Sequence, residues 1–258
     1  YDLNEEIGFF NDLWKYSIPD KTWTWVQGTS TVNQQPSFED NAISLDGADD
    51  LIEFDTLRNY RSDFTWELWI RTEETELKSI MNFRGSDIDC CAPFTDGEFD
   101  LVLFNGTIFF FSGPTPNVFS SNLINDGKWH HIALVGEIDV EGADDRFTIY
   151  VDGIKDTSTK GNLSDNVDDT DTSKHVTRIG RGAFPTFDGS IDEVRIWEVE
   201  RTEEEIRNAA NSKLTGAEPG LLAYYDFNQG VAGGDNTGLD SVIDRTANQF
   251  HGVLVNFN

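Results

Sequence analysis

The residues best suited to acid–base or metal chemistry occur in this chain as adjacent pairs. Asp192 is followed by Glu193, and His130 is followed by His131. Both pairs lie in segments with the alternating pattern of β-strands, where neighbouring side chains point to opposite faces. Neither pair can act jointly on one bond or one ion, so we expect neither a zinc site nor a histidine-based catalytic triad.

The two cysteines, Cys90 and Cys91, are also adjacent. Neighbouring Cα atoms lie about 3.8 Å apart, whereas ordinary disulfides join Cα atoms roughly 4.4–6.8 Å apart. Two reduced thiols and a strained vicinal disulfide are therefore both open interpretations, and the mass of the unreduced protein separates them.

The sequence is strongly acidic. Its 258 residues include 47 Asp and Glu but 19 Lys and Arg, which gives a formal net charge of −28. Such a surface repels nucleic-acid phosphates and anionic lipids, so we expect neither as a partner. It suits calcium, which prefers carboxylate and carbonyl oxygens. Acidity that only keeps an exported protein in solution explains the charge equally well.

An Asp-rich stretch between residues 162 and 174 is one candidate for cation binding. It contains Asp165, Asp168, Asp169 and Asp171. Carboxylates this close together repel one another unless a cation neutralises them. The spacing differs from an EF-hand loop, which has a central Gly and a Glu at its twelfth position. We interpret the stretch as a solvated loop, and keep Asp165 and Asp168 as candidate ligand contacts.

Short β-strands dominate the elements that must position these groups. Phe64, Trp66, Leu68 and Ile70 alternate with more polar residues and predict a strand with one buried face. Further strands are expected at 99–104, 107–112, 129–135, 147–151, 176–180, 191–197, 221–227 and 252–257. Asn105-Gly106 and Asp152-Gly153 predict tight hairpins, because a type I′ turn needs positive φ at both central positions. Many short strands joined by turns favour a sandwich or jelly roll.

One short helix is expected from Thr202 to about Asn211. Thr202 can cap the first amides, and Glu205 can reach back to the Thr202 N–H to form a capping box.

Residues 1–36 have a sequence pattern that differs from the rest of the chain. Asn11–Tyr16, a turn at Pro19–Lys21 and Thr22–Val26 predict a two-stranded ribbon. This segment resembles a single kelch blade, and one blade cannot close a propeller. We therefore divide the chain into a kelch-like N-terminal hairpin, residues 1–36, and a main domain, residues 37–258.

The order of the motifs in the main domain is more specific than any one of them. They are, in order, Ala42–Phe54, Phe64–Ile70, Gly127–Ala133, Tyr150–Gly153 and Phe187–Trp197. This series resembles the laminin-G-like/concanavalin A-like jelly-roll family over residues 40–257. The resemblance implies an all-β, two-sheet jelly-roll sandwich with one short helix. The segments 220–227 and 244–248 resemble the strand and turn that often open such a domain, and we expect them to complete this sandwich from its C-terminal end.

The same jelly roll occurs in laminarinase- and agarase-type glycoside hydrolases, which carry E-x-D-x-x-E on one strand. The nearest match here is Glu98-Phe99-Asp100, and Leu103 replaces the third carboxylate. Retaining hydrolysis needs two carboxyl groups about 5–5.5 Å apart across the scissile bond. We therefore expect a binding protein and not an enzyme, with a glycoside hydrolase as a distant alternative.

The family resemblance also implies a structural calcium ion and a structural role for His131. The calcium ligands would be Asp46, the Gly47 carbonyl and Asp192, and Asp49 and Asp50 could contribute. The alternative is that Asp46-Gly47 is a simple turn and Asp192 a surface acid.

Loop aromatics beside hydrogen-bonding side chains are candidate ligand contacts. Phe184 and Phe187 fit, as does Phe94 with Asp96. We expect Phe109–Phe111 to pack in the core and sheet rather than form a stacking platform.

These features favour a non-catalytic, extracellular carbohydrate-binding (lectin-like) module. It is expected to be stabilised by calcium, to belong to a larger secreted or cell-surface protein, and to bind a glycan or surface glycoprotein. The alternative is a protein-binding adhesion module. No apolar run approaches the ~20 residues that a membrane-spanning helix needs, so membrane insertion is not expected.

Overall fold

The computed structural model describes residues 13–17, 22–27, 41–54, 62–85, 99–112, 116–138, 145–160, 175–231, 236 and 238–257. The chain divides into two compact units, Tyr1–Gln35 and Pro36–Asn258. In the first unit, β1 (Leu13–Ser17) and β2 (Thr22–Gln27) form an antiparallel pair, which is the ribbon predicted from the sequence.

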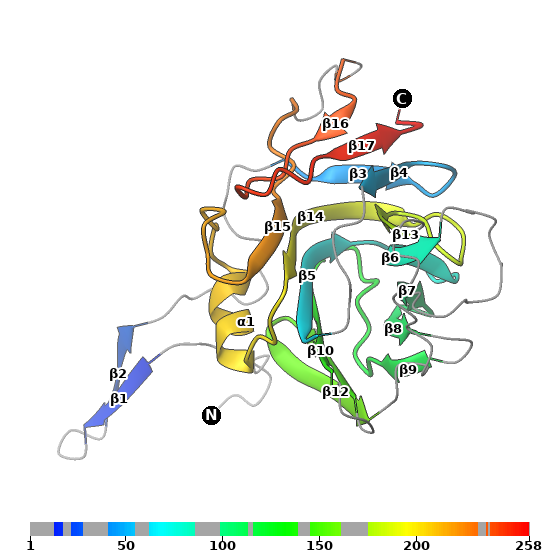
Figure 1. Cartoon of the computed structure of the whole chain (residues 1–258). Coiled ribbons are helices and arrows are strands. Elements are labelled where there is room, and N and C mark those ends of the chain that lie inside the picture. Colours follow the sequence, from blue (N-terminus) through cyan, green and yellow to red (C-terminus); the bar gives the residue numbers. More distant parts are fainter. Residues whose placement is uncertain are drawn as a thin grey trace. The chain divides into compact units, whose positions relative to one another are not determined.

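The second unit contains two antiparallel sheets, as predicted (Figure 1). The strands of the first sheet are β3 (Ile43–Asp46), β5 (Phe64–Arg71), β10 (Trp129–Glu137), β11 (Arg146–Val151), β12 (Ile154–Lys160), β14 (Asp188–Trp197) and β15 (Leu221–Tyr225). Their spatial order is β12-β11-β10-β5-β14-β15, with β3 paired to β14.

The second sheet has the order β16-β17-β4-β13-β6-β7-β8-β9. Its strands are β4 (Leu51–Phe54), β6 (Lys78–Gly85), β7 (Phe99–Phe104), β8 (Thr107–Phe111), β9 (Pro116–Phe119), β13 (His175–Ile179), β16 (Ser241–Val242) and β17 (Gly252–Val255). The C-terminal tail contributes to both sheets, because β15 pairs with β14 and β17 pairs with β4. The tail therefore completes the sandwich, as expected.

The core lies between the two sheets and is built from alternate residues of each strand. On β5, the side chains of Phe64, Trp66, Leu68 and Ile70 are all at most 1% exposed and belong to this core. The predicted hairpin turns also form. Asn105 and Gly106 have φ values of 50° and 78°, so the backbone conformation matches the turn that the sequence demanded.

Four strands of the second sheet, β4, β6, β9 and β16, were not among the expected strands. The register of β6 shifts between Ser79 and Met81, and this irregularity breaks the alternation that would reveal a strand. Strand β9 begins at Pro116, a residue that usually argues against a strand. Proline is tolerated here because β9 is the last strand at the edge of the sheet.

Helix α1 (Glu203–Ala210) covers part of the outer face of the first sheet. Its predicted capping box is present, with Thr202 as N-cap and Glu205 bonded back to the Thr202 N–H. Ile206 packs against three side chains of the sheet, namely Ala133, Val135 and Tyr150.

Arg195 on β14 connects the first sheet to the C-terminal end of α1. Its side chain has no exposed surface, and Nη1 donates to the Ala209 carbonyl at 2.7 Å. Nη2 donates to the Ser212 carbonyl at 2.8 Å and to Glu193 at 2.5 Å. The Ala209 carbonyl is in the last turn of α1 and Ser212 lies just beyond it, so these bonds hold a buried cation at the C-terminal end of the helix, where its dipole is negative.

Glu67 on β5 is a buried carboxylate in the same layer. It has no exposed surface and lies 3.7 Å from Nη1 of Arg195 and 3.2 Å from Nε of Arg201. The buried imidazole of His131 lies 3.3 Å from it. This position is the structural one that the family resemblance implied for His131.

His130 faces the other way and lies between two carboxylates. Its Nδ1 lies 2.9 Å from Asp152 and its Nε2 lies 3.1 Å from Asp126. Burial disfavours the protonated imidazole, but the hydrogen bonds and charges of Asp152 and Asp126 outweigh it and raise the pKa of His130. Partial burial of Asp126 is likewise outweighed by its bonds to Lys128 and His130, which lower the pKa of Asp126 to about 2.

Replacing Arg195 by Ala should lower the free energy of unfolding by about 3–5 kcal/mol, because Glu67 and Glu193 would be left buried without this cation. Urea denaturation measures the effect. Arg207→Ala is the matched control, since Arg207 is exposed and pairs with Glu203 one turn away, and it should cost less than about 0.5 kcal/mol. Equal losses in the two variants would contradict the role given to Arg195.

The stabilisation by His130 should depend on pH. A raised pKa in the folded state favours folding fully below the unfolded value of about 6.5, and the contribution disappears as the pH rises through the folded pKa. The difference in unfolding free energy between the wild type and His130→Gln should therefore be largest near pH 6 and shrink in alkaline solution. Asp126→Asn should weaken this pH dependence. If the difference in unfolding free energy between the wild type and His130→Gln stayed constant from pH 6 to pH 9, protonated His130 would not stabilise the fold.

Candidate functional site

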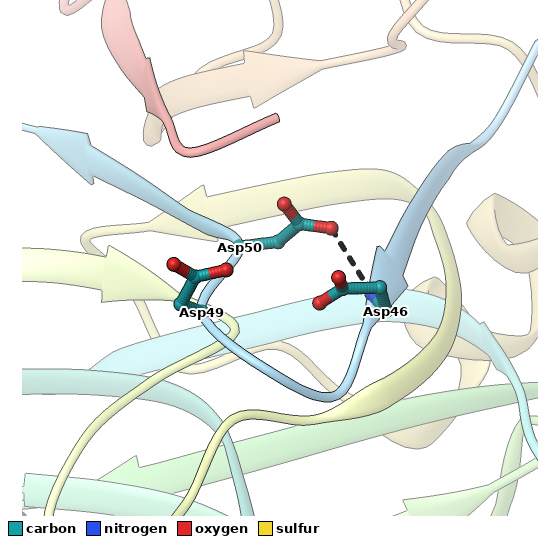
Figure 2. Close-up of side chains that lie close together, drawn as sticks. All are labelled: Asp46, Asp49 and Asp50. Atoms are coloured by element: carbon teal, nitrogen blue, oxygen red, sulfur yellow. Dashed lines mark hydrogen bonds between the residues drawn. The ribbon is translucent and has the colours of Figure 1, made fainter. Parts of the chain in front are cut away.

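Three carboxylates meet at the turn between β3 and β4. Asp46 ends β3, and Asp49 and Asp50 immediately precede β4. One oxygen from each side chain can be chosen so that all three lie within 4.8 Å of one another. Figure 2 shows the three side chains around a common space. The turn carries the chain from the first sheet to the second, because β3 pairs with β14 and β4 pairs with β13.

Backbone amides hold two of these carboxylates. Oδ2 of Asp50 accepts the Asp46 N–H at 3.0 Å, and Oδ1 of Asp46 accepts the Ala48 N–H at 2.8 Å. Asp50 is 7% exposed, while Asp46 and Asp49 are exposed. Burial raises the pKa of Asp50, and the charges of Asp46 and Asp49 raise it further, against the lowering effect of the Asp46 N–H. The turn therefore concentrates negative charge that a cation would neutralise.

The structure does not bring Asp192 to this cluster. In the antiparallel register of β3 and β14, Asp46 lies opposite Asp188, and Asp192 lies opposite Trp69 on β5. Four residues along a strand separate Asp192 from that position by roughly 13 Å. Asp192 is also 2% exposed, and its Oδ1 accepts the Glu193 N–H. Of the expected set of Asp46, Gly47 and Asp192, Asp192 therefore lies away from the turn, and the acidic residues that meet there are Asp46, Asp49 and Asp50. Calcium binding at this turn stays a prediction.

Gly47 occupies the turn for a steric reason. Its φ is 74°, and a Cβ at this position would lie 2.9 Å from Cβ of Asp188. The turn therefore requires glycine.

Several predicted ligand contacts lie outside the described residues. These are Phe94, Asp96, Asp165 and Asp168, together with the two cysteines. Phe187 is described, and it lies in the core with no exposed surface, so it cannot contact a ligand. The expectation for Phe187 is corrected: the loop aromatic packs inward between the sheets. Phe184 is partly exposed, with its ring 5.6 Å from that of Phe111.

The loop that leads from β13 to β14 covers polar side chains on the outer face of the second sheet. Oδ2 of Asp100 accepts the Ser79 hydroxyl at 2.9 Å and the Ala183 N–H at 2.7 Å. Asn82 donates its amide to the Arg181 carbonyl. A Cβ at Gly182 would lie 2.5 Å from Oδ2 of Asp100, so the close approach of this loop requires glycine.

This loop closes off strand β7, which carries the partial match to the hydrolase motif. Asp100 has no exposed surface and is engaged by the loop, while Leu103 points into the core. Asp100 therefore cannot reach a substrate, and position 103 offers no carboxylate.

Beyond this loop, the outer face of the second sheet carries a group of aromatic rings that we call the phenyl row. It consists of Phe104, Phe109, Phe111, Phe119 and Phe184. Phe109–Phe111 were expected to pack in the core and sheet rather than to form a stacking platform. Phe110 does so, but Phe109 and Phe111 point outward and are partly exposed. Period-two alternation alone could have separated Phe109 and Phe111 from Phe110.

A family model described as the Concanavalin A-like lectin/glucanases superfamily, of the laminin G type, matches residues 46–207. Among curated proteins, rat "Sushi, von Willebrand factor type A, EGF and pentraxin domain-containing protein 1" is 26% identical over 145 residues. That match covers 54% of this chain and 4% of the rat protein, so the chain spans a small fraction of its length.

Among solved structures, a candidate carbohydrate binding protein from Bacteroides ovatus shares the fold with a TM-score of 0.60 and 19% identity. The match covers 92% of this chain and 66% of that one. Domain 4 of an extracellular arabinanase from Geobacillus stearothermophilus, solved with arabinotriose, gives a TM-score of 0.49 at 20% identity, over 68% of this chain and 79% of that one.

The family match leaves the kelch resemblance of residues 1–36 a prediction, because it begins at residue 46. It covers more than half of the chain and coincides with the two-sheet fold described above. The protein thus belongs to the concanavalin A-like lectin/glucanases superfamily, through a jelly-roll domain of the laminin G type.

Proposed function

We propose that this protein is a non-catalytic carbohydrate-binding module, stabilised by calcium at the turn between β3 and β4. The observation that carries the proposal is the burial of Asp100. The strand that most resembles a glycosidase motif has its carboxylate closed off by a loop and offers Leu103 in place of the third acid. In its described residues this strand therefore offers no exposed pair of carboxyl groups of the kind that cleaves a sugar chain.

The fold supports a carbohydrate as the ligand class. The Bacteroides ovatus protein with the same fold is described as a candidate carbohydrate binding protein, and this description supports a carbohydrate as the ligand. A fold by itself does not fix a ligand, since function resides in particular surfaces. A protein-binding adhesion module is the alternative, and it predicts no affinity for any glycan.

Calcium is the second part of the proposal. Asp46, Asp49 and Asp50 offer hard oxygen ligands, and their mutual repulsion would be relieved by a divalent cation. An ion at this turn would be held where the chain passes between the sheets, so its binding would stabilise both sheets together.

We further propose that the module works outside the cell, as part of a larger secreted or cell-surface protein. Its partner there would be a glycan or a surface glycoprotein. In the part of the chain that the structure describes, no helix is long and apolar enough to cross a membrane.

Calcium at a hundred times its dissociation constant should stabilise the wild type by about 2.7 kcal/mol. Thermal unfolding with calcium or with EDTA measures this as a rise of several degrees in Tm. Asp49→Asn should abolish the rise and should increase the Tm in EDTA, because it removes one of the charges that repel Asp50.

Asp240→Asn is the matched control for this experiment, since it removes an exposed carboxylate outside the cluster and should leave the calcium response intact. Equal Tm values for the wild type in calcium and in EDTA would refute the calcium site.

Binding to an array of plant, animal and marine glycans in the presence of calcium tests the carbohydrate proposal. The wild type should bind at least one glycan class and should release no reducing sugar from it. Failure to bind any glycan would instead favour the adhesion alternative, and release of reducing sugar would disprove the non-catalytic assignment.

A further inference from the structure

The phenyl row is an exposed aromatic surface on the second sheet. Its rings follow one another at centroid distances of 6.0 Å from Phe104 to Phe109, 6.2 Å from Phe109 to Phe111, and 5.6 Å from Phe111 to Phe184. Phe119 lies 5.4 Å from Phe109 on the neighbouring strand. Phe119 is 55% exposed and Phe104 is 39% exposed. A contiguous exposed aromatic patch on a folded domain is characteristic of a binding surface.

The core does not require these rings. Strand β8 buries Ile108 and Phe110 between the sheets, and these residues complete the core on this strand. Phe109 and Phe111 occupy the alternate positions, where a sheet facing water ordinarily carries polar residues. The outward phenylalanines therefore cost solubility without adding to the core.

The chain segment that carries most of the row is uncharged. No charged residue occurs in the sequence between Asp100 and Asp126, in a chain in which 26% of residues are charged. This interval contains β8 and β9 and the turns next to them. A ligand on this segment thus desolvates no ionised side chain of residues 101–125, and the rest of the surface, with its large negative charge, repels anionic ligands.

Two features at the edge of the sheet beside the row disfavour strand addition. β9 is the last strand of its sheet, and it opens with Pro116, which has no N–H to donate. Next to it, Asp156 on β12 accepts the backbone N–H groups of Ser121 and Asn122 at 2.7 and 2.9 Å. These features favour contact through the faces and edges of the rings over extension of the sheet.

We infer that the phenyl row binds a neutral, unbranched polysaccharide whose sugar rings present apolar C–H faces. Polarised C–H groups are attracted to the electron-rich faces of aromatic rings, and successive rings accommodate successive sugars. Because residues 101–125 carry no cation and the net charge of the protein is −28, neutral sugars are favoured over uronic acids and sulfated sugars. This inference rests on the proposed carbohydrate-binding function and assigns it a surface.

Calorimetry with cellohexaose, laminarihexaose and xylohexaose tests the inference, with a galacturonic acid hexamer as the anionic comparison. Phe119→Ala and Phe109→Ala should each weaken binding of the best neutral probe about tenfold or more. Phe119→Trp should retain binding, because it keeps an aromatic ring. Val253→Ala is the matched control, since Val253 is 56% exposed on β17 at the far end of the same sheet, and it should change nothing.

Each other outcome overturns a different statement. If the wild type binds a glycan and both Phe variants bind it equally well, the row is not the site and the proposed function stands. If the wild type binds no glycan, the proposed function and this inference both fail. If the wild type sediments as a dimer and Phe119→Ala as a monomer, the row joins two copies of this chain and the inference is overturned.

Hydrogen exchange gives a readout independent of affinity. The saturating neutral hexasaccharide should slow exchange in peptides covering residues 104–119 and leave those covering β17 unchanged. Protection confined to β17 or to the β3–β4 turn would place the glycan elsewhere.

Discussion

The guanidinium of Arg195 is the charge on which the outer layer of this domain depends. An isolated charge inside a protein is prohibitively costly, so it persists only where carboxylates and carbonyls surround it. Here Glu67 and Glu193 supply the negative charge, and the carbonyls of Ala209 and Ser212 supply the remaining acceptors. These bonds leave little freedom in where α1 ends, and Trp69 reinforces the position by donating to the Ala210 carbonyl. The helix is thus fixed by polar contacts at its end and by the packing of Ile206 along its length.

The two sheets differ in what covers their outer faces, because α1 packs on the first sheet. The first sheet is covered on its outer face by α1 and by the segment that follows it, so polar residues such as Glu67 and His131 become buried there. The second sheet has no helix on its outer face in the described residues (Figure 1). A loop anchored on Asp100 and Ser79 closes one part of that face, and the phenyl row occupies the part next to it. The outer face of the second sheet therefore keeps exposed aromatic rings beside this loop.

Local chemistry made much of the fold predictable from the sequence. The alternation in β5, the turn at Asn105-Gly106 and the capping box at Thr202 each depend on a few neighbouring residues, and each is confirmed. Strand β6 was missed because its register shift disrupts the alternation, and β9 because it begins with proline. The pairing of Asp46 with Asp188 rather than Asp192 depends on the register between strands far apart in sequence, which no local pattern encodes. For this reason the sequence placed Asp46 at the turn correctly but grouped it wrongly with Asp192.

An uncharged, phenylalanine-rich hairpin at the edge of a sheet is also a hazard for the unfolded chain. Segments with high β-propensity and no charge are those that assemble into cross-β aggregates. Two features oppose this: Pro116 interrupts the segment, and the net charge of −28 keeps molecules of this protein apart. Because that repulsion is screened by salt, the margin against aggregation should narrow as ionic strength rises. The negative charge on the rest of the molecule thus opposes association between copies of the protein, although the uncharged phenyl row is exposed to solvent.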